Sequence, residues 1–193
     1  MIRTVLMSLG AIAMACSGSN ASTDGAAGSG AGTSLPGQAN ATLVIQKGVT
    51  NCPTPGKTYE LGNPRGPTST SVGDVLIDGE QGASVTCSVQ GRGPFTFSAT
   101  IRGTSGVSMT ISDGVIDADG LNGTAMLDVY TPDLAATYTS GRHGCGVTVV
   151  NQQVKPGAMW ATLLCPTIAS ASTAQSCTVG AGSTFVLENC AGS

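Results

Sequence analysis

The sequence predicts an all-β protein: a single antiparallel β-sandwich of about ten short strands, stapled by disulfides, behind a disordered tether. From residue 41 onward, short runs of alternating apolar and polar residues are separated by Gly, Pro, Asn and Asp. That period of two is typical of strands with one buried face. No stretch combines a 3.6-residue period with helix caps. Six cysteines outside the N-terminal region form an even set, as expected of disulfides. A β-barrel is the alternative architecture.

Residues 1–15 have the features of a signal peptide. Arg3 precedes an apolar stretch over residues 4–15, which is too short to span a bilayer as a helix. The stretch ends in Ala13-Met14-Ala15-Cys16. This run resembles the lipobox of bacterial lipoproteins, although Ala13 stands where that family usually has Leu. An ordinary secretory signal, cut at a small residue, is the alternative.

The lipoprotein resemblance implies export, cleavage before Cys16 and membrane anchoring through lipid on Cys16. The family's modified cysteine carries a diacylglycerol, usually with a third acyl chain, such as palmitate, on its amine. Ser17 implies sorting to the outer membrane if the host is Gram-negative. Residues 16–40 then form a Gly/Ser/Ala-rich tether with little to bury, which we expect to be disordered. Residues 41–193 have the length of one domain, the β-sandwich.

The strands follow one another at short intervals. We expect them over residues 41–46, 72–78, 83–90, 95–102, 107–112, 115–116, 124–130, 144–151, 158–165, 176–179 and 184–188. Turn residues at 91–94 and 155–157 predict two hairpins. Residues 133–136 could form one helical turn, and the small, polar run 169–174 is more typical of a loop.

The cysteines other than Cys16 are expected to form three bridges, for which 15 connectivities exist. They are Cys52, Cys87, Cys145, Cys165, Cys177 and Cys190. Cys145 and Cys165 flank a predicted hairpin, and Cys177 and Cys190 flank a Gly-rich turn, which would leave Cys52 with Cys87. Non-local pairings such as Cys52 with Cys190 are an open alternative. A zinc site with His143 is less favoured, because no two cysteines are closely spaced.

The composition argues against several functions. After removal of residues 1–15 the side chains carry seven basic and eleven acidic groups without a basic stripe, which excludes nucleic-acid binding. Phosphate-binding glycine motifs and the Gly-x-Ser-x-Gly and Ser-x-x-Lys motifs of hydrolases are missing from the sequence. His143 lies in a predicted turn, where a solvated loop histidine is the simplest interpretation. A hydrolase built from distant carboxylates, such as Glu60, Glu80 and Glu188, remains a lesser hypothesis.

One acidic segment is a candidate ion site. Asp117, Asp119 and Asn122 have the closely spaced oxygen donors of a calcium loop, but they lack the spacing and the closing Glu of an EF-hand. Asp, Asn and Gly are also the residues that β-turns require. We therefore predict no metal and no cofactor, and keep calcium at these three residues as the weaker interpretation.

The function expected from these features is a membrane-tethered, non-enzymatic surface or interaction module of the cell envelope. The alternative is a glycan- or peptide-binding β-sandwich that uses its Ser/Thr-rich strand faces or the loop at residues 113–123, with an envelope protein or glycan as partner. Trp160 is a possible stacking platform, but its alternation with Thr162 and Leu164 favours a core role. Residues 75–103 with the following Ser112-Asp113-Gly114 faintly resemble mycobacterial surface-antigen lipoproteins, which implies no particular site residue.

Overall fold

The computed structural model describes residues 35–64 and 73–192. The signal, Cys16 and the tether up to residue 34 lie outside these ranges. The described residues form an all-β, antiparallel structure with 14 strands. The strands are β1 (Gln38–Lys47), β2 (Thr58–Leu61), β3 (Asn63–Pro64), β4 (Gly73–Asp74), β5 (Leu76–Ile77), β6 (Ser84–Gly91), β7 (Phe95–Arg102), β8 (Ser108–Ile116), β9 (Gly123–Tyr130), β10 (Tyr138–Thr139), β11 (Cys145–Lys155), β12 (Ala158–Ala169), β13 (Ser176–Val179) and β14 (Thr184–Glu188).

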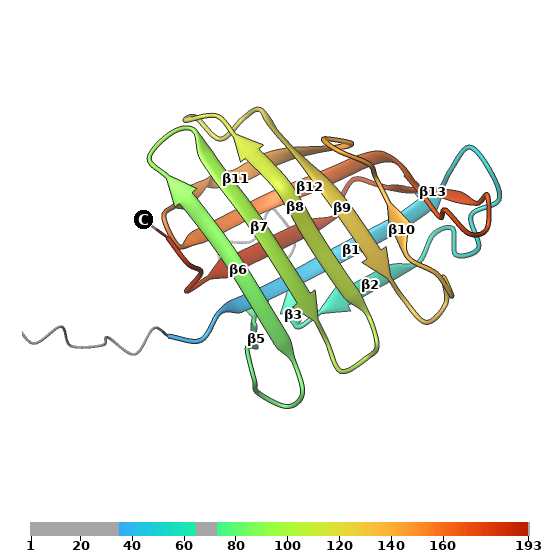
Figure 1. Cartoon of the computed structure of the whole chain (residues 1–193), viewed down its shortest axis with the longest axis horizontal. Coiled ribbons are helices and arrows are strands. Elements are labelled where there is room, and N and C mark those ends of the chain that lie inside the picture. Colours follow the sequence, from blue (N-terminus) through green and yellow to red (C-terminus); the bar gives the residue numbers. More distant parts are fainter. Residues whose placement is uncertain (1–34, 65–72, 193) are drawn as a thin grey trace, which may run out of the picture. The chain divides into compact units, whose positions relative to one another are not determined.

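Twelve of these strands form one continuous hydrogen-bonded sheet that is folded into two layers. The front layer in Figure 1 contains β6, β7, β8 and β9, and the back layer contains β1, β14, β12 and β11. The strands of the two layers cross at a large angle (Figure 1), as in orthogonally packed sandwiches. Strands β10 and β11 join the layers, because each of them pairs with both β12 and β9. The predicted sandwich is therefore confirmed. Its two layers are parts of one continuous sheet.

Strands β13 and β14 act as one interrupted strand between β1 and β12. The first half of β1 pairs with β14, from Gln38↔Glu188 onward, and its end pairs with β13, up to Lys47↔Cys177. Strand β12 pairs with the same two segments in the same order. The Gly-rich segment between β13 and β14 is thus an interruption and not the reversal that a hairpin would need.

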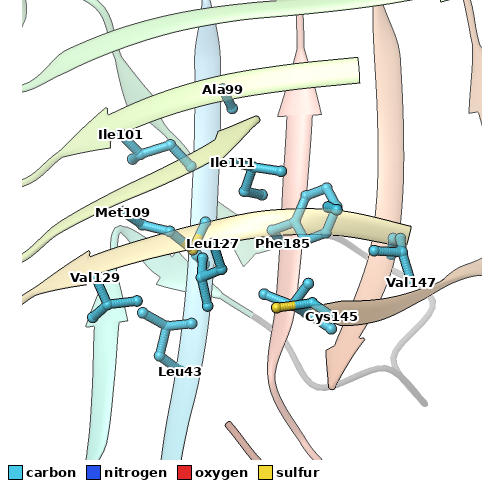
Figure 2. Packing of buried hydrophobic residues seen from close by; sticks show 14 of the residues in the cluster. Leu43, Ala99, Ile101, Met109, Ile111, Leu127, Val129, Cys145, Val147 and Phe185 are labelled. Atoms are coloured by element: carbon cyan, nitrogen blue, oxygen red, sulfur yellow. The ribbon is translucent and has the colours of Figure 1, made fainter. Parts of the chain in front are cut away.

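The core lies between the layers and is built from the apolar half of each alternating strand. The predicted inward positions of β6 and β7 are all buried. Figure 2 shows side chains from both layers meeting there, with Leu43 from the back layer and Ile101, Ile111 and Leu127 from the front layer. Most of these side chains are aliphatic, and Phe97 and Phe185 stack with ring centroids 6.0 Å apart. Burial of this apolar surface is the main favourable contribution to folding.

Three disulfides close the structure: Cys52–Cys177, Cys87–Cys190 and Cys145–Cys165. The hairpin bridge Cys145–Cys165 is confirmed. The pairings Cys52–Cys87 and Cys177–Cys190, and the alternative Cys52–Cys190, are wrong. Cys177 and Cys190 sit toward opposite ends of the β13–β14 line, because that line does not turn back on itself.

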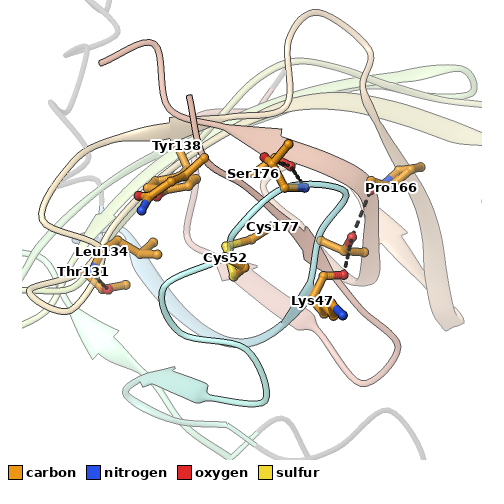
Figure 3. Close-up of a disulfide and its surroundings, with 11 residues drawn as sticks. Lys47, Cys52, Thr131, Leu134, Tyr138, Pro166, Ser176 and Cys177 are labelled. Carbon is orange, nitrogen blue, oxygen red and sulfur yellow. Dashed lines mark hydrogen bonds between the residues drawn. A yellow bond between two sulfur atoms is a disulfide. The ribbon is translucent and has the colours of Figure 1, made fainter. Parts of the chain in front are cut away.

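The two bridges between distant parts of the sequence each hold a segment outside the strands against a strand: the loop after β1 on β13, and the residues after β14 on β6. Cys52 belongs to the loop after β1, and its bridge to Cys177 holds that loop on β13 (Figure 3). The Thr178 hydroxyl beside it donates to the carbonyl oxygen of Pro166 at 3.0 Å.

Three disulfides in one domain are typical of proteins that fold outside the reducing cytoplasm, which indicates an extracytoplasmic protein.

The observed elements differ from the predicted ones at a few places. Strand β1 begins at Gln38, so the last three residues of the predicted tether belong to the sheet. The runs 107–112 and 115–116 form one strand, β8, with an irregular register between Ser112 and Val115. The segment 133–136 contains a hydrogen-bonded turn and no helix. Within the described ranges, no helix is long and apolar enough to cross a membrane.

Candidate functional site

The outer face of the front layer carries a regular array of Ser and Thr side chains. We call it the hydroxyl face; it consists of Ser84, Thr86, Ser88, Thr96, Ser98, Thr100, Ser108, Thr110 and Ser112 on β6, β7 and β8. All of them are exposed or half-buried, because the alternating positions of the same strands point into the core. This face is turned toward the viewer in Figure 1.

The strand register aligns these hydroxyls across the sheet. Thr86 lies opposite Thr100, and Thr100 lies opposite Thr110, so that three threonines form one row. The Thr100 and Thr110 hydroxyl oxygens are 3.5 Å apart. Neighbouring strands are about 4.8 Å apart, so hydroxyl groups recur at that interval across the face. The array is polar and is supported by paired strands.

A hollow lies at one end of this face. Its volume is about 530 Å³. It is lined by Ser88, Gln90, Thr96, Phe97, Ser98, Asp113, Gly114, Val115, Arg142 and His143, and we call it the Arg142 hollow. Four segments therefore contribute: β6, β7, the irregular part of β8, and the turn between β10 and β11.

An ion pair crosses the rim of the hollow. The Arg142 Nε donates to Asp113 Oδ2 at 3.0 Å, with the two side chains 76% and 44% exposed. A surface pair of this kind contributes about 0–1 kcal/mol to stability, so its main effect is to orient the Arg142 side chain. It fixes the guanidinium through Nε, and among the described residues no partner occupies the two terminal nitrogens of Arg142.

The irregular part of β8, between Ser112 and Val115, forms part of the wall of the Arg142 hollow. Asp113 has a left-handed backbone with φ 50°, as tolerated by Asp, and its carboxylate reaches Arg142. Gly114 follows it opposite Phe97, where a β-carbon would lie 2.6 Å from the Phe97 ring and 2.5 Å from its carbonyl oxygen. Only glycine fits this close approach without a shift of β7 or β8.

His143 lies in the turn before β11, as predicted, and it also lines the hollow. Its Nδ1 is 3.0 Å from the Thr124 hydroxyl oxygen on β9. This hydrogen bond orients the exposed ring over the front layer. No pattern in the sequence predicts that His143 and Asp113 lie near each other. Asp113 is 29 residues away from Arg142, which precedes His143 in the chain.

The acidic candidate loop is a tight turn. The Asp117 carboxylate accepts hydrogen bonds from the backbone amides of Leu121 at 3.0 Å and Asn122 at 3.1 Å, and from the Asn122 side chain at 2.9 Å. Hydrogen bonding with Asp119, followed by the bonds from Asn122, lowers the pKa of Asp117 to about 2. The described residues contain no group of three His, Cys, Asp or Glu side chains that could hold a metal ion. The Asp117 carboxylate and Asp119 Oδ1, which also accepts from the Leu121 amide at 3.0 Å, thus serve the turn.

Trp160 is 1% exposed and cannot act as a stacking platform in this structure. It packs with Val150 and Val186 in a small cluster apart from the main core, on the outer side of the back layer. Among the residues that the structure describes, none forms a hydrogen bond with its Nε1. A second hollow of about 710 Å³ lies beside it, between the end of β11 and the residues after β14. The alternation with Thr162 and Leu164 predicted a place in the core, but this face of β12 points outward, with Leu164 51% exposed, and Trp160 is buried there in its own small cluster.

The fold and the two hollows can be set against known proteins. No protein-family model, curated protein or solved structure matches the chain.

Proposed function

We propose that the protein is a non-enzymatic interaction module of the cell envelope, anchored to a membrane through lipid on Cys16. One observation carries this proposal: the six other cysteines all pair with one another. None of them is available to Cys16, so the remaining thiol stands alone at the end of a lipobox-like run. Lipid on that sulfur accounts for the odd cysteine in an extracytoplasmic chain.

The hydroxyl face is the surface that such a module would present. The tether reaches the domain at Gln38, on β1 of the back layer, whereas the hydroxyl face covers the front layer. The attachment strand therefore does not occupy this face. The side chains considered for other roles support a binding role as well: His143 is oriented by the Thr124 hydroxyl, and the Asp117 carboxylate considered for calcium accepts hydrogen bonds within its own turn.

Replacement of Cys16 tests the anchor. Cys16→Ser removes the acylated sulfur, and we expect the protein to move from the membrane fraction to the soluble exported fraction while its three disulfides still form. Ser17→Ala, one residue further on, leaves the acceptor thiol in place and should remain with the membrane. Fractionation with detergent phase separation measures the result. Equal partitioning of the wild type and Cys16→Ser would overturn the proposed anchor.

A further inference from the structure

We propose that the Arg142 hollow binds a neutral glycan, a role that presupposes the interaction module proposed above. The hollow has about the volume of known small-ligand sites, which span roughly 300–1,000 Å³. It lies open at the surface, and Thr96, Ser98, Asp113, Arg142 and His143 are all exposed. A ligand can therefore reach these polar groups without any rearrangement of the core.

The lining combines donors and acceptors in the way that sugar hydroxyls require. The hydroxyls of Ser88, Thr96 and Ser98 can each donate and accept, and so can the amide of Gln90. Asp113 adds an acceptor, and the terminal nitrogens of Arg142 add donors in a planar fork. Most of these side chains stand on paired strands and are short, so little conformational entropy is lost when they bind.

Charge favours a neutral ligand over an anionic one. Asp113 lies 3.0 Å from Arg142 and neutralises the guanidinium at the rim. The whole sequence carries a net charge of −3, which does not favour long-range attraction of an acidic polymer. Hydrogen bonds to hydroxyl groups are then the interactions that the hollow offers.

A peptide added as an extra strand does not fit this end of the sheet. Strand addition needs a free edge, and the outer edge of β6 is already occupied. The Val89 amide donates to the Ala191 carbonyl oxygen at 2.9 Å, and its carbonyl oxygen accepts from the Gly157 amide at 2.9 Å. Further along β6, the Val85 amide donates to Asp78 Oδ1 at 2.8 Å. A ligand must therefore bind on the face of these strands, where hydroxyl groups predominate.

The test uses the full-length Cys16→Ser protein on a printed array of neutral oligosaccharides, with a peptide array in parallel. We expect binding to one group of glycans. Thr96→Val and Arg142→Ala should each weaken it roughly three- to tenfold, as expected for the loss of one or two hydrogen bonds. Thr58→Val on β2 and Arg102→Ala on β7 remove an exposed threonine and an exposed arginine outside the hollow, and should leave affinity unchanged.

Melting temperatures of all four variants establish that each is folded. Failure of the folded protein to bind any glycan, selective binding to peptides, or equal effects of the hollow and control variants would each overturn the glycan site. None of these outcomes bears on membrane anchoring, which fractionation of Cys16→Ser tests separately.

Discussion

Cys87 and Cys190 join strand β6 to the C-terminal segment, across 103 residues of sequence. The bridge holds Ala191 against β6, where its amide donates to the Cys87 carbonyl oxygen at 3.0 Å and its carbonyl oxygen accepts from Val89. The edge of the front layer is thus covered by backbone that is covalently fixed in place. Covered edges of this kind protect a sheet from pairing with other chains.

Removal of this bridge should destabilise the domain more than removal of the local one. The chain-entropy model gives roughly 4–5 kcal/mol for closing a loop of this length and roughly 3 kcal/mol for the 20-residue loop of Cys145–Cys165. We expect the double substitution Cys87→Ser with Cys190→Ser to lower the free energy of unfolding more than Cys145→Ser with Cys165→Ser, and to increase aggregation. Urea denaturation measures both. A larger loss from the local bridge would contradict this order.

Gly114 should not tolerate a side chain. In Gly114→Ala the new β-carbon meets the Phe97 ring and backbone, so we expect a loss of roughly 1–3 kcal/mol and a distorted Arg142 hollow. Gly146→Ala, on strand β11, is the matched control, because the atom nearest to its added β-carbon, the Leu164 carbonyl oxygen, lies 3.9 Å away. Thermal unfolding should show a clear decrease for the first variant and little change for the second. Equal effects would contradict the close approach of β8 to Phe97.

Asp117 should make the domain sensitive to acid. Folding lowers its pKa from 3.8 to about 2 through hydrogen bonds with Asp119 and Asn122. Its stabilising contribution is therefore complete above pH 4 and is lost as the pH falls toward 2. Asp117→Asn keeps a side-chain oxygen for the turn but cannot titrate, so its melting temperature should fall less between pH 5 and pH 2. An unchanged acid sensitivity in this variant would disprove the assignment.

Trp160, the single tryptophan, gives a direct readout of the back layer. Because its ring is buried, its emission maximum should lie at a shorter wavelength than that of free tryptophan in water. For the same reason, iodide should quench its fluorescence only weakly. Glycan binding in the front-layer hollow should leave this emission unchanged. Free access of iodide to the ring in the folded protein would contradict the observed burial.

The strands could be predicted from the sequence because alternation is a local signal. The predicted bounds of β7, β13 and β14 agree with the structure. Strand β2 was not predicted, since Thr58–Leu61 is too short to show a period clearly, and its pairing with β1 is what defines it. Local propensity also allowed one helical turn at residues 133–136, where the chain forms a simple turn.

The candidate site could be predicted from the sequence only in part. Alternating Ser and Thr residues indicated a polar strand face, but the hollow depends on the meeting of Asp113 and Arg142, which tertiary structure alone determines. The local bridge Cys145–Cys165 was predicted correctly, but the other two pairings failed for the same reason. A glycine-rich segment between two strands is typical of a hairpin, whereas here β13 and β14 continue in one direction along β1.

Mass spectrometry of the mature protein isolated from its own membrane tests the central claim most directly. We predict an N-terminus at Cys16 that carries acyl chains, together with six oxidised cysteines in the pairs Cys52–Cys177, Cys87–Cys190 and Cys145–Cys165. An unmodified N-terminus at another residue, or Cys16 joined to one of the other six cysteines, would contradict the account.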